Sequence, residues 1–299
     1  MNATPEPARE HLEKPSWLKI RASNTERFSQ VRSVLKEERV STVCDASHCP
    51  NISECWSSHS ATFLILGRIC TRSCRFCAVP SNRIGEEVDD EEPSRIARAV
   101  SRLGLNYVVI TSVTRDDLWD FGAGHFSNVV RQIQLENPYT KTELLIPDFQ
   151  GCEDSITTIV RSKPCVIGHN LETVRRLQIE TRDPKADYDR SLRVLETIKE
   201  IDSKIFTKSS LMLGLGESRR EVIETMKDIR NVGVDVLTLG QYLRPKDTNI
   251  EVREFVSPED FENLRIEALA LGFGHVAAGP FVRSSYRAFE FVDLQKGGE

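Results

Sequence analysis

From residue 61 onward, apolar strand-like stretches alternate with helix-like stretches, and this alternation limits the fold more than any other feature of the chain. The strand candidates are Thr62–Gly67, Tyr107–Ser112, Thr142–Ile146, Cys165–Ile167, Phe206–Leu213, Val236–Gln241 and His275–Ala278. Helices are predicted between and after them at Glu91–Leu103, His125–Glu136, Ser155–Arg161, Leu171–Gln178, Tyr188–Ile201, Arg219–Val232 and Pro258–Ala270. Such alternation predicts a parallel sheet covered by helices. We therefore expect an α/β fold, a partial (β/α)6-type TIM barrel with an N-terminal extension and a C-terminal tail.

The chain divides into three parts. Residues 1–30 are polar and contain prolines, which predicts an extended arm, and the apolar spacing over Phe28–Glu38 predicts a helix. We expect residues 1–60 to form the N-terminal extension, residues 61–280 to form the barrel and residues 281–299 to form the tail.

Length and charge exclude several classes of protein. The 299 residues, 39% of them hydrophobic, are enough for one large barrel. A net charge of −5 argues against a nucleic-acid binder, and no run approaches the roughly 18 apolar residues of a membrane span. The segment Met1–Lys19 fits neither a secretion signal nor a transit peptide. We therefore expect a cytoplasmic protein with reduced cysteines and with no nucleic-acid or membrane partner.

Polar side chains are concentrated where the predicted strands end. Examples are Thr111–Asp117 after the second strand, Asp148 after the third and Gly168–Thr173 after the fourth. Each group alone has a structural explanation, such as a solvated loop or a helix cap for residues 115–117 and a hydrogen-bonded core side chain for His169. Because reactive residues of a β/α barrel lie at the carboxyl ends of the strands, their concentration there favours a functional site.

Three cysteines follow the first strand of the predicted barrel. Cys70, Cys74 and Cys77, here called the Cys70 triplet, have the spacing Cys-x3-Cys-x2-Cys, so their thiolates can converge in one loop. A four-iron four-sulfur cluster has four iron corners, and three thiolates leave one iron free to bind another molecule. A structural zinc site is the alternative, but His48 or His59 would have to be recruited at an unusual spacing as its fourth ligand.

A second triplet precedes the barrel. Cys44, Cys49 and Cys55, here called the Cys44 triplet, are separated by Asp, Ser, Pro and Asn residues, which favour a chain of turns around one bound object. A second iron–sulfur cluster fits three soft thiolates, and a zinc knuckle completed by His48 or His59 is the alternative. No further ligand follows locally, so the fourth must come from elsewhere in the chain, from solvent or from a substrate.

The loop of the Cys70 triplet resembles that of the radical S-adenosylmethionine superfamily, and the chain as a whole resembles the lipoyl synthase family. The matching motifs span about residues 43–288, and two cysteine triplets together with RSSY are far more specific than either triplet alone. The motifs are the Cys44 triplet with its CPN continuation, GRICTRSCRFCAV, TSVTRDDL, LLIPDFQG, GHNLETV, TKSSLMLGLGE, GQYLRP and HVAAGPFVRSSYRA.

For the Cys70 triplet, the resemblance implies a radical-generating four-iron four-sulfur cluster. Its free iron would bind S-adenosylmethionine, and reductive cleavage of that molecule yields a 5′-deoxyadenosyl radical. The resemblance also implies that Thr111, Asn170 and Arg182 contact S-adenosylmethionine. An Asn can bond ribose or carboxylate, and an Arg can form a two-point pair with the methionine carboxylate. A turn-forming Asn and a surface Arg are the alternatives.

For the Cys44 triplet, the resemblance implies an auxiliary four-iron four-sulfur cluster that is completed by a serine of the RSSY motif. Ser285 is favoured over its neighbour Ser284. A tail hydroxyl that bonds only to backbone is the alternative for either serine. Hard serine oxygen matches iron poorly beside soft thiolates, so this corner is the one most easily released.

The activity implied by the resemblance is the insertion of two sulfur atoms, at carbons six and eight of an octanoyl chain that is amide-linked to a lysine of a carrier protein. The auxiliary cluster is implied to be the sulfur donor. The implied carrier is a glycine-cleavage H protein or an E2 lipoyl domain. Further implied partners are an electron donor such as ferredoxin or flavodoxin and an iron–sulfur carrier that rebuilds the spent cluster. Because unactivated C–H bonds resist acid–base chemistry, no catalytic side chain is expected beyond the cofactor ligands.

Three positions depart from the pattern of the family. Phe121 stands where a glycine is usual, Gly168 replaces an Asn, and Ser210 replaces a Gly. A Phe in a turn that needs positive φ is strained, so the loop around Phe121 is the one whose geometry we expect to differ. Two other functions stay open: a biotin synthase-like sulfur-inserting enzyme, which does not explain the Cys44 triplet or RSSY, and a non-catalytic iron–sulfur carrier, which leaves the barrel unused.

Overall fold

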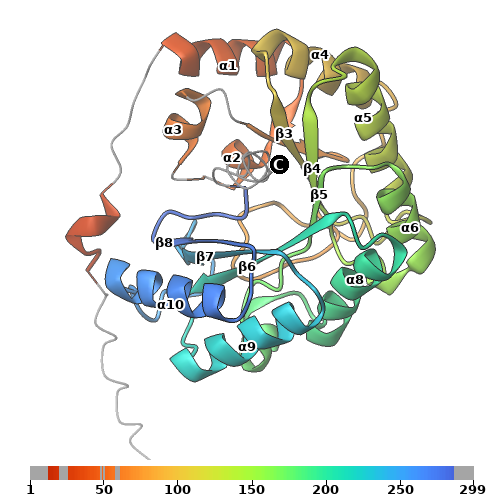
Figure 1. Ribbon diagram of the computed structural model, residues 1–299. Helices are drawn as coiled ribbons and strands as arrows, with labels where there is room; N and C mark the ends of the chain where they lie inside the picture. Colours follow the sequence, from red (N-terminus) through yellow and green to blue (C-terminus); the bar gives the residue numbers. More distant parts are fainter. Residues whose placement is uncertain (1–12, 20–25, 48, 50, 58–60, 286–299) are drawn as a thin grey trace, which may run out of the picture.

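The computed structural model describes residues 13–19, 26–47, 49, 51–57 and 61–285. It contains one sheet whose eight strands are ordered as in the sequence (Figure 1). Strand β1 pairs antiparallel with β2, and every later pair is parallel. Among the described residues, no pairing joins β8 to β1, so the barrel is open. The strands are β1 (Ser41–Thr42), β2 (Thr62–Ile65), β3 (Tyr107–Ser112), β4 (Lys141–Leu145), β5 (Val166–Gly168), β6 (Phe206–Leu213), β7 (Val236–Gln241) and β8 (His275–Gly279).

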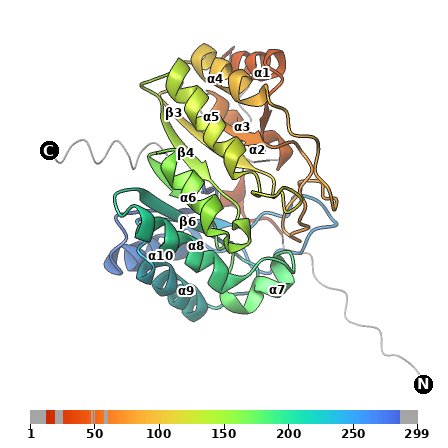
Figure 2. The ribbon, with the colours of Figure 1, turned by 90° about the vertical axis from the view of Figure 1, so that its right-hand side faces the viewer.

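The helices lie in an arc on the outside of this sheet. Figure 1 shows α4 to α6 and α8 to α10 following the strands around the molecule, with α2 and α3 on the open side, and Figure 2 shows α4, α5, α6 and α8 covering the outer face. The helices are α1 (Glu26–Glu37), α2 (Val43–Ala46), α3 (Ile52–Ser57), α4 (Glu92–Leu103), α5 (Ala123–Glu136), α6 (Glu153–Arg161), α7 (Gln178–Thr181), α8 (Tyr188–Ile201), α9 (Arg219–Asn231) and α10 (Pro258–Ala270), with 3-10 turns at Ser16–Leu18, Phe149–Gly151 and Arg175–Leu177.

The prediction of a partial barrel is confirmed. All seven expected strands are present, and six strand–helix units, β2 to β7 with their helices, precede the last strand, β8. Three helices begin directly after a capping residue, because the side chains of Asp187, Ser218 and Ser257 each accept a hydrogen bond from a backbone N–H of the first turn.

The prediction of a helix over Leu171–Gln178 is wrong. Glu172 has φ of +70°, and its backbone N–H and C=O bond to Ser210 and Met212 of β6 at 3.0 and 2.8 Å. This segment therefore continues beside the sheet, and helical structure starts only with the 3-10 turn at Arg175. Pairing with the neighbouring strand outweighed the local helical pattern.

The Cys44 triplet was expected in a chain of turns, but two of its cysteines lie on short helices and only Cys49 lies between them. Cys44 belongs to α2, which the Thr42 side chain caps by accepting from the N–H of Asp45 at 3.3 Å. Cys55 belongs to α3. The next residue of this helix, Trp56, is buried and packs on Phe28 of α1 with ring centroids 5.0 Å apart. Packing against α1 thus favours helix in a segment whose many turn-forming residues predicted turns.

The core is apolar on the outer face of the sheet, where the helices pack. Side chains such as Phe63, Ile110 and Leu144 are fully buried against α4 to α6, and each contributes about 1.5–3 kcal/mol by leaving water. Leu237 and Leu239 occupy the same position in the second half of the sheet. In the described part of the chain, no helix is both long and apolar enough to cross a membrane.

Candidate functional site

The loop of the Cys70 triplet folds over the carboxyl end of β2. It closes on itself through hydrogen bonds from Cys70 N–H to the Pro80 carbonyl and from Asn82 N–H to the Cys70 carbonyl, both 2.9 Å long. Backbone N–H groups also point at its sulfurs, from Thr114 to the Cys70 Sγ and from Asp183 to the Cys74 Sγ, each at 3.3 Å. Donors aimed at sulfur stabilise thiolate, the form that binds metal.

The three sulfurs of this loop are close enough to influence one another. Burial raises the pKa of Cys74 to about 12 and that of Cys77 to about 11, and in both cases neighbouring thiols of the triplet add to the increase. Without a metal these thiols are protonated at neutral pH, so metal binding must displace their protons. A set of three thiols in one loop fits an iron–sulfur cluster by the chemistry of its donors.

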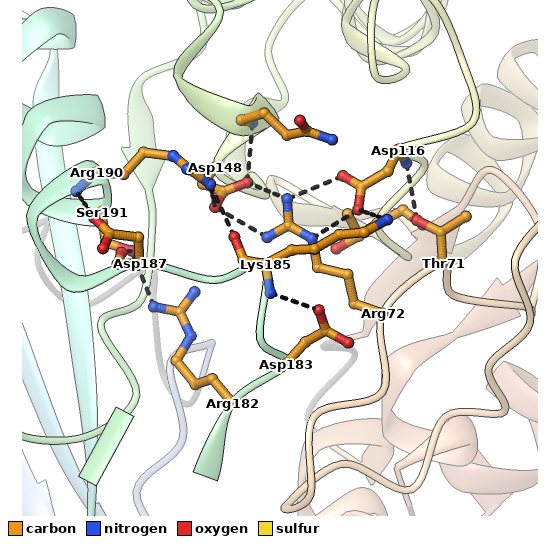
Figure 3. A network of polar contacts seen from close by, with 12 residues as sticks. Thr71, Arg72, Asp116, Asp148, Arg182, Asp183, Lys185, Asp187, Arg190 and Ser191 are labelled. Atoms are coloured by element: carbon orange, nitrogen blue, oxygen red, sulfur yellow. Dashed lines mark hydrogen bonds and ion pairs between the residues drawn. The ribbon is translucent and has the colours of Figure 1, made fainter. Parts of the chain in front are cut away.

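A buried arginine holds this loop on the barrel. Figure 3 shows Arg72 between Asp116, which follows β3, and Asp148, which follows β4. Its guanidinium donates to both carboxylates in two-point pairs, at 3.0 and 2.9 Å to Asp116 and at 2.9 and 2.6 Å to Asp148. Arg72 is 6% exposed and Asp148 1% exposed. Paired and buried on all sides, the three residues fix the loop relative to two strand ends.

The same network reaches the segment between α7 and α8. Arg190 lies 3.6 Å from Asp148 and Lys185 lies 3.4 Å from Asp116 (Figure 3). Asp183 accepts a hydrogen bond from the Ser73 N–H at 2.8 Å. Although burial by itself raises the pKa of Asp148, the Arg72 guanidinium outweighs it and lowers that pKa to about 2. Asp148 is therefore ionised at neutral pH.

The hydroxyl predicted to contact S-adenosylmethionine on β3 is already bonded to the sheet. Thr111 donates to the Leu145 carbonyl at 3.0 Å. Its neighbour Ser112 is different, because its buried Oγ has no hydrogen-bond partner among the residues that the structure describes. A buried hydroxyl without a partner is costly, so Ser112 is the stronger candidate for a ligand contact at this strand end.

Asn170 lies at the end of β5 beside two residues of unusual environment. Its Nδ2 donates to Glu172 at 3.1 Å, while its buried Oδ1 lacks a partner within the described ranges. His169 donates from Nδ1 to the Ile146 carbonyl at 2.9 Å, and burial lowers its pKa to about 4, so the ring is neutral. Burial raises the pKa of Glu172. The carboxyl group of Glu172 in turn adds to the increase in the pKa of the Cys77 thiol. Sequence reasoning missed Glu172, since a strained φ at a non-glycine residue is visible only in the structure.

Arg182 is not a surface residue but is 7% exposed. Its Nη1 bonds only to the neutral Gln178 amide at 3.2 Å and the Ser191 hydroxyl at 2.9 Å, as Figure 3 shows for Ser191. No ion pair to a carboxylate is formed by Arg182 within the described part of the chain. A buried guanidinium of this kind can receive a carboxylate from a ligand.

The Cys44 triplet lines a pocket together with residues from the far end of the chain. The pocket wall consists of Cys44, Cys49, Asn51, Cys55, Ala61, Thr62, Arg283 and Ser285. Ser285 is on this wall, whereas Ser284 is not among its residues. Three thiols and a hydroxyl around one space are a donor set that fits an iron–sulfur cluster.

Asn51 connects the two ends of the chain at this pocket. Its Nδ2 donates to the Phe281 carbonyl at 2.6 Å, across a sequence separation of 230 residues. Burial raises the pKa of Cys44 to about 11 and raises that of Cys49 as well. Sequence reasoning missed Asn51 and Arg283 as site residues, although the CPN and RSSY motifs that contain them were the available signal.

Within residues 13–19, 26–47, 49, 51–57 and 61–285, no three His, Cys, Asp or Glu side chains are placed to hold one ion together. His48 and His59, which the zinc alternatives would recruit, lie outside the described residues.

The three departures from the family pattern lie in the turn before α5, in β5 and in β6. Phe121 has φ of +57°, so the expected strain is present in the turn before α5. Ser210 is buried in β6, and Gly168 has room for a Cβ, since its nearest neighbours would lie at 3.5 Å or more.

Comparison with known proteins agrees with this geometry. Residues 64–229 match the model of the radical SAM superfamily. Curated lipoyl synthases are similar over nearly the whole chain: that of Caldanaerobacter subterraneus subsp. tengcongensis is 50% identical, covering 96% of this chain and 99% of its own. That of Myxococcus xanthus is 48% identical, covering 94% of each chain.

Solved structures share the fold at low identity. Methylornithine synthase has a TM-score of 0.54 at 12% identity, covering 84% of this chain and 81% of its own. The FeFe-hydrogenase maturase HydG from Carboxydothermus hydrogenoformans has a TM-score of 0.55 at 16% identity, covering 92% and 72%. The solved structures show that the fold is shared. The curated relatives, at about half identity over nearly the whole chain, show the family. The chain is therefore an enzyme of the lipoyl synthase family, within the radical S-adenosylmethionine superfamily.

Proposed function

We propose that this enzyme inserts two sulfur atoms, at carbons six and eight of an octanoyl group bound to a lysine of a carrier protein. S-adenosylmethionine and iron–sulfur chemistry follow from the family. The number of clusters, their ligands and their roles are part of the proposal. The observation that carries it is the pocket in which the Cys44 triplet meets Ser285, because a radical enzyme that only cleaves S-adenosylmethionine has no use for a second thiol site.

In this proposal the two triplets hold two four-iron four-sulfur clusters. When bound, the cluster at the Cys70 triplet supplies the electron that cleaves S-adenosylmethionine, and the cluster at the Cys44 triplet supplies the sulfur. Ser285 closes the second ligand set, and its hard oxygen makes that corner the easiest to release.

The side chains at the strand ends bind and orient S-adenosylmethionine. Arg182 receives the methionine carboxylate, because it is buried and, among the described residues, its side chain bonds to the neutral groups of Gln178 and Ser191 and to no carboxylate. Asn170 and Ser112 contribute the buried oxygen atoms that lack partners in the described structure. Thr111 supports the same strand end through the Leu145 carbonyl.

The proposed partners follow from the chemistry. The substrate is an octanoylated carrier, either a glycine-cleavage H protein or an E2 lipoyl domain. A ferredoxin or flavodoxin would supply electrons, and an iron–sulfur carrier would rebuild the spent cluster. In the described part of the chain no disulfide bond joins any of the eight cysteines, which fits a reducing compartment such as the cytoplasm.

The test is anaerobic reconstitution of the wild type and of two variants in which one whole triplet is changed to Ala. Iron, sulfide and S-adenosylmethionine cleavage are measured, followed by mass spectrometry of an octanoylated carrier peptide. Each variant should lose about half of the iron, as expected for two thiolate-held clusters. Only the Cys70 variant should lose cleavage, and both should lose sulfur insertion.

Other results would favour the alternative functions. A Cys44 variant that keeps all its iron would overturn the sulfur-donor role and favour a single-cluster radical enzyme. A wild type that holds two clusters but never cleaves S-adenosylmethionine would instead indicate an iron–sulfur carrier.

A further inference from the structure

The segment that brings Arg283 to the thiol pocket is held by close contacts. Val282 donates to the Gly279 carbonyl at 3.1 Å, and Asn51 donates to the Phe281 carbonyl at 2.6 Å. Gly240 of β7 lies so close that a Cβ there would collide with the Val282 carbonyl. The position of Arg283 on the pocket wall is therefore determined by the barrel and by the Cys44 loop, not by its own side chain.

Arg283 lacks the counter-charge that a buried arginine normally has. Its Nη1 donates to the Val282 carbonyl at 2.7 Å, and no carboxylate of the described residues forms an ion pair with it. The contrast is Arg72, which is enclosed by the carboxylates of Asp116 and Asp148. A charged group taken out of water without a partner is unfavourable, so a ligand at this site must supply the partner.

The neighbours of Arg283 become anionic when metal binds. Arg283 shares the pocket wall with Cys44, Cys49 and Cys55. An arginine is protonated at neutral pH, because its ordinary pKa lies far above neutrality. The pocket thus carries a fixed positive charge next to three thiols and a hydroxyl, all of which must lose a proton to bind iron.

We infer that Arg283 supplies the counter-charge of the auxiliary cluster: its guanidinium offsets the negative charge of three thiolates and one alkoxide, which slows iron loss and favours the reduced state of the cluster. This inference rests on the proposed function. The net charge and the hydrogen bonds around a cluster are among the main determinants of its reduction potential, so both effects are measurable without turnover.

The experiment uses the full chain with Cys70, Cys74 and Cys77 changed to Ala, so that only the Cys44 site holds a cluster. Arg283→Met removes the charge and keeps the length, Arg283→Lys keeps the charge, and Arg220→Met removes a charge that is 88% exposed on α9. After anaerobic reconstitution, iron release to a ferrous chelator is timed, and the midpoint potential is measured by redox titration with EPR detection. Thermal unfolding of each apoprotein checks that it is folded.

Arg283→Met should release iron about tenfold faster, the effect of losing one charged hydrogen bond, and its midpoint potential should be more negative. Arg283→Lys and Arg220→Met should behave like the parent. Equal release rates and potentials in the parent and in Arg283→Met would overturn the inference alone, and so would a Lys variant as defective as the Met variant. A parent that holds no cluster would overturn the proposed function, and this inference with it.

Discussion

The two cysteine triplets differ in how the chain holds them. The loop of the Cys70 triplet is fixed from within the barrel by Arg72, whose charge two buried carboxylates satisfy. The pocket of the Cys44 triplet is built from two short helices and a chain segment 230 residues away, and its arginine, Arg283, has no carboxylate partner in the described structure. One site is part of the barrel, and the other is assembled from the two ends of the chain.

This difference fits the proposed roles. A cluster that transfers electrons in every turnover benefits from a rigid, pre-formed loop. A cluster that gives up its sulfur must be opened and rebuilt, and a site made of short helices and a chain end opens without disturbing the core. If this view is right, changes at the first site should affect folding, and changes at the second should affect cluster retention.

The largest expected effect is on folding. Arg72→Met leaves Asp116 and Asp148 buried without their partner, so the free energy of unfolding of the apoprotein should fall by about 3–5 kcal/mol, measured by urea denaturation. Arg75→Met, in the same loop but exposed, is the matched control and should change stability by less than about 0.5 kcal/mol. If Arg72→Met and Arg75→Met have similar free energies of unfolding, the Cys70 loop is not fixed by the buried Arg72 pairs, and the contrast between the two sites is lost.

The next effect separates the two serines of the tail. Ser285→Ala should lower sulfur insertion by about 100-fold while S-adenosylmethionine cleavage continues, because it removes an oxygen from the pocket wall. Ser284→Ala should retain insertion, since that residue is not part of the wall. Product is measured by mass spectrometry of the carrier peptide, and the opposite result would assign the ligand to Ser284.

A smaller effect concerns pH. The pKa of Asp148 is lowered from 3.8 to about 2 in the folded protein, so its ionisation stabilises the fold above about pH 4, and this contribution is lost as the pH falls toward 2. Asp148→Asn should therefore lower the free energy of unfolding by about 2 kcal/mol near pH 6, and this difference from the wild type should shrink toward pH 2. Urea denaturation of both apoproteins across this range measures it. Asp189→Asn, at an exposed pair, should show little cost at any pH, and a cost for Asp148→Asn that does not depend on pH would contradict the assignment.

The smallest effect comes from two asparagines, each of which donates hydrogen bonds to backbone carbonyls beside one of the cysteine triplets. Asn51 holds the tail to the Cys44 loop, and Asn249 donates to the Cys77 carbonyl at 2.9 Å and the Arg75 carbonyl at 3.0 Å. Each Asn→Ala change removes hydrogen bonds worth about 1 kcal/mol apiece. Iron release is timed in proteins that keep one cysteine triplet and have the other changed to Ala. Asn51→Ala should speed up iron release only from the Cys44 triplet, and Asn249→Ala only from the Cys70 triplet. Equal acceleration at both sites would show that the two sites are not independent.

Much of the fold was predictable because its signals are local. Near-continuous apolar runs such as residues 236–241 become buried strands, and Ser218 starts a helix by bonding to its own first turn. Cysteine spacing likewise indicates chemistry without any structure, since three thiols within a few residues cannot separate. The helix expected over Leu171–Gln178 failed for the converse reason, because β6 competes for the backbone of Glu172.

By itself, the sequence determined the open barrel, the two triplets and the family to which the chain belongs. Only the tertiary structure decided which distant groups surround each triplet: Asp116 and Asp148 around Arg72, and Asn51, Arg283 and Ser285 around the Cys44 pocket. The reason is physical. Spacing along the chain constrains neighbours within a helix, strand or loop, whereas burial of an unpaired charge or hydroxyl depends on segments brought together by packing of the whole barrel.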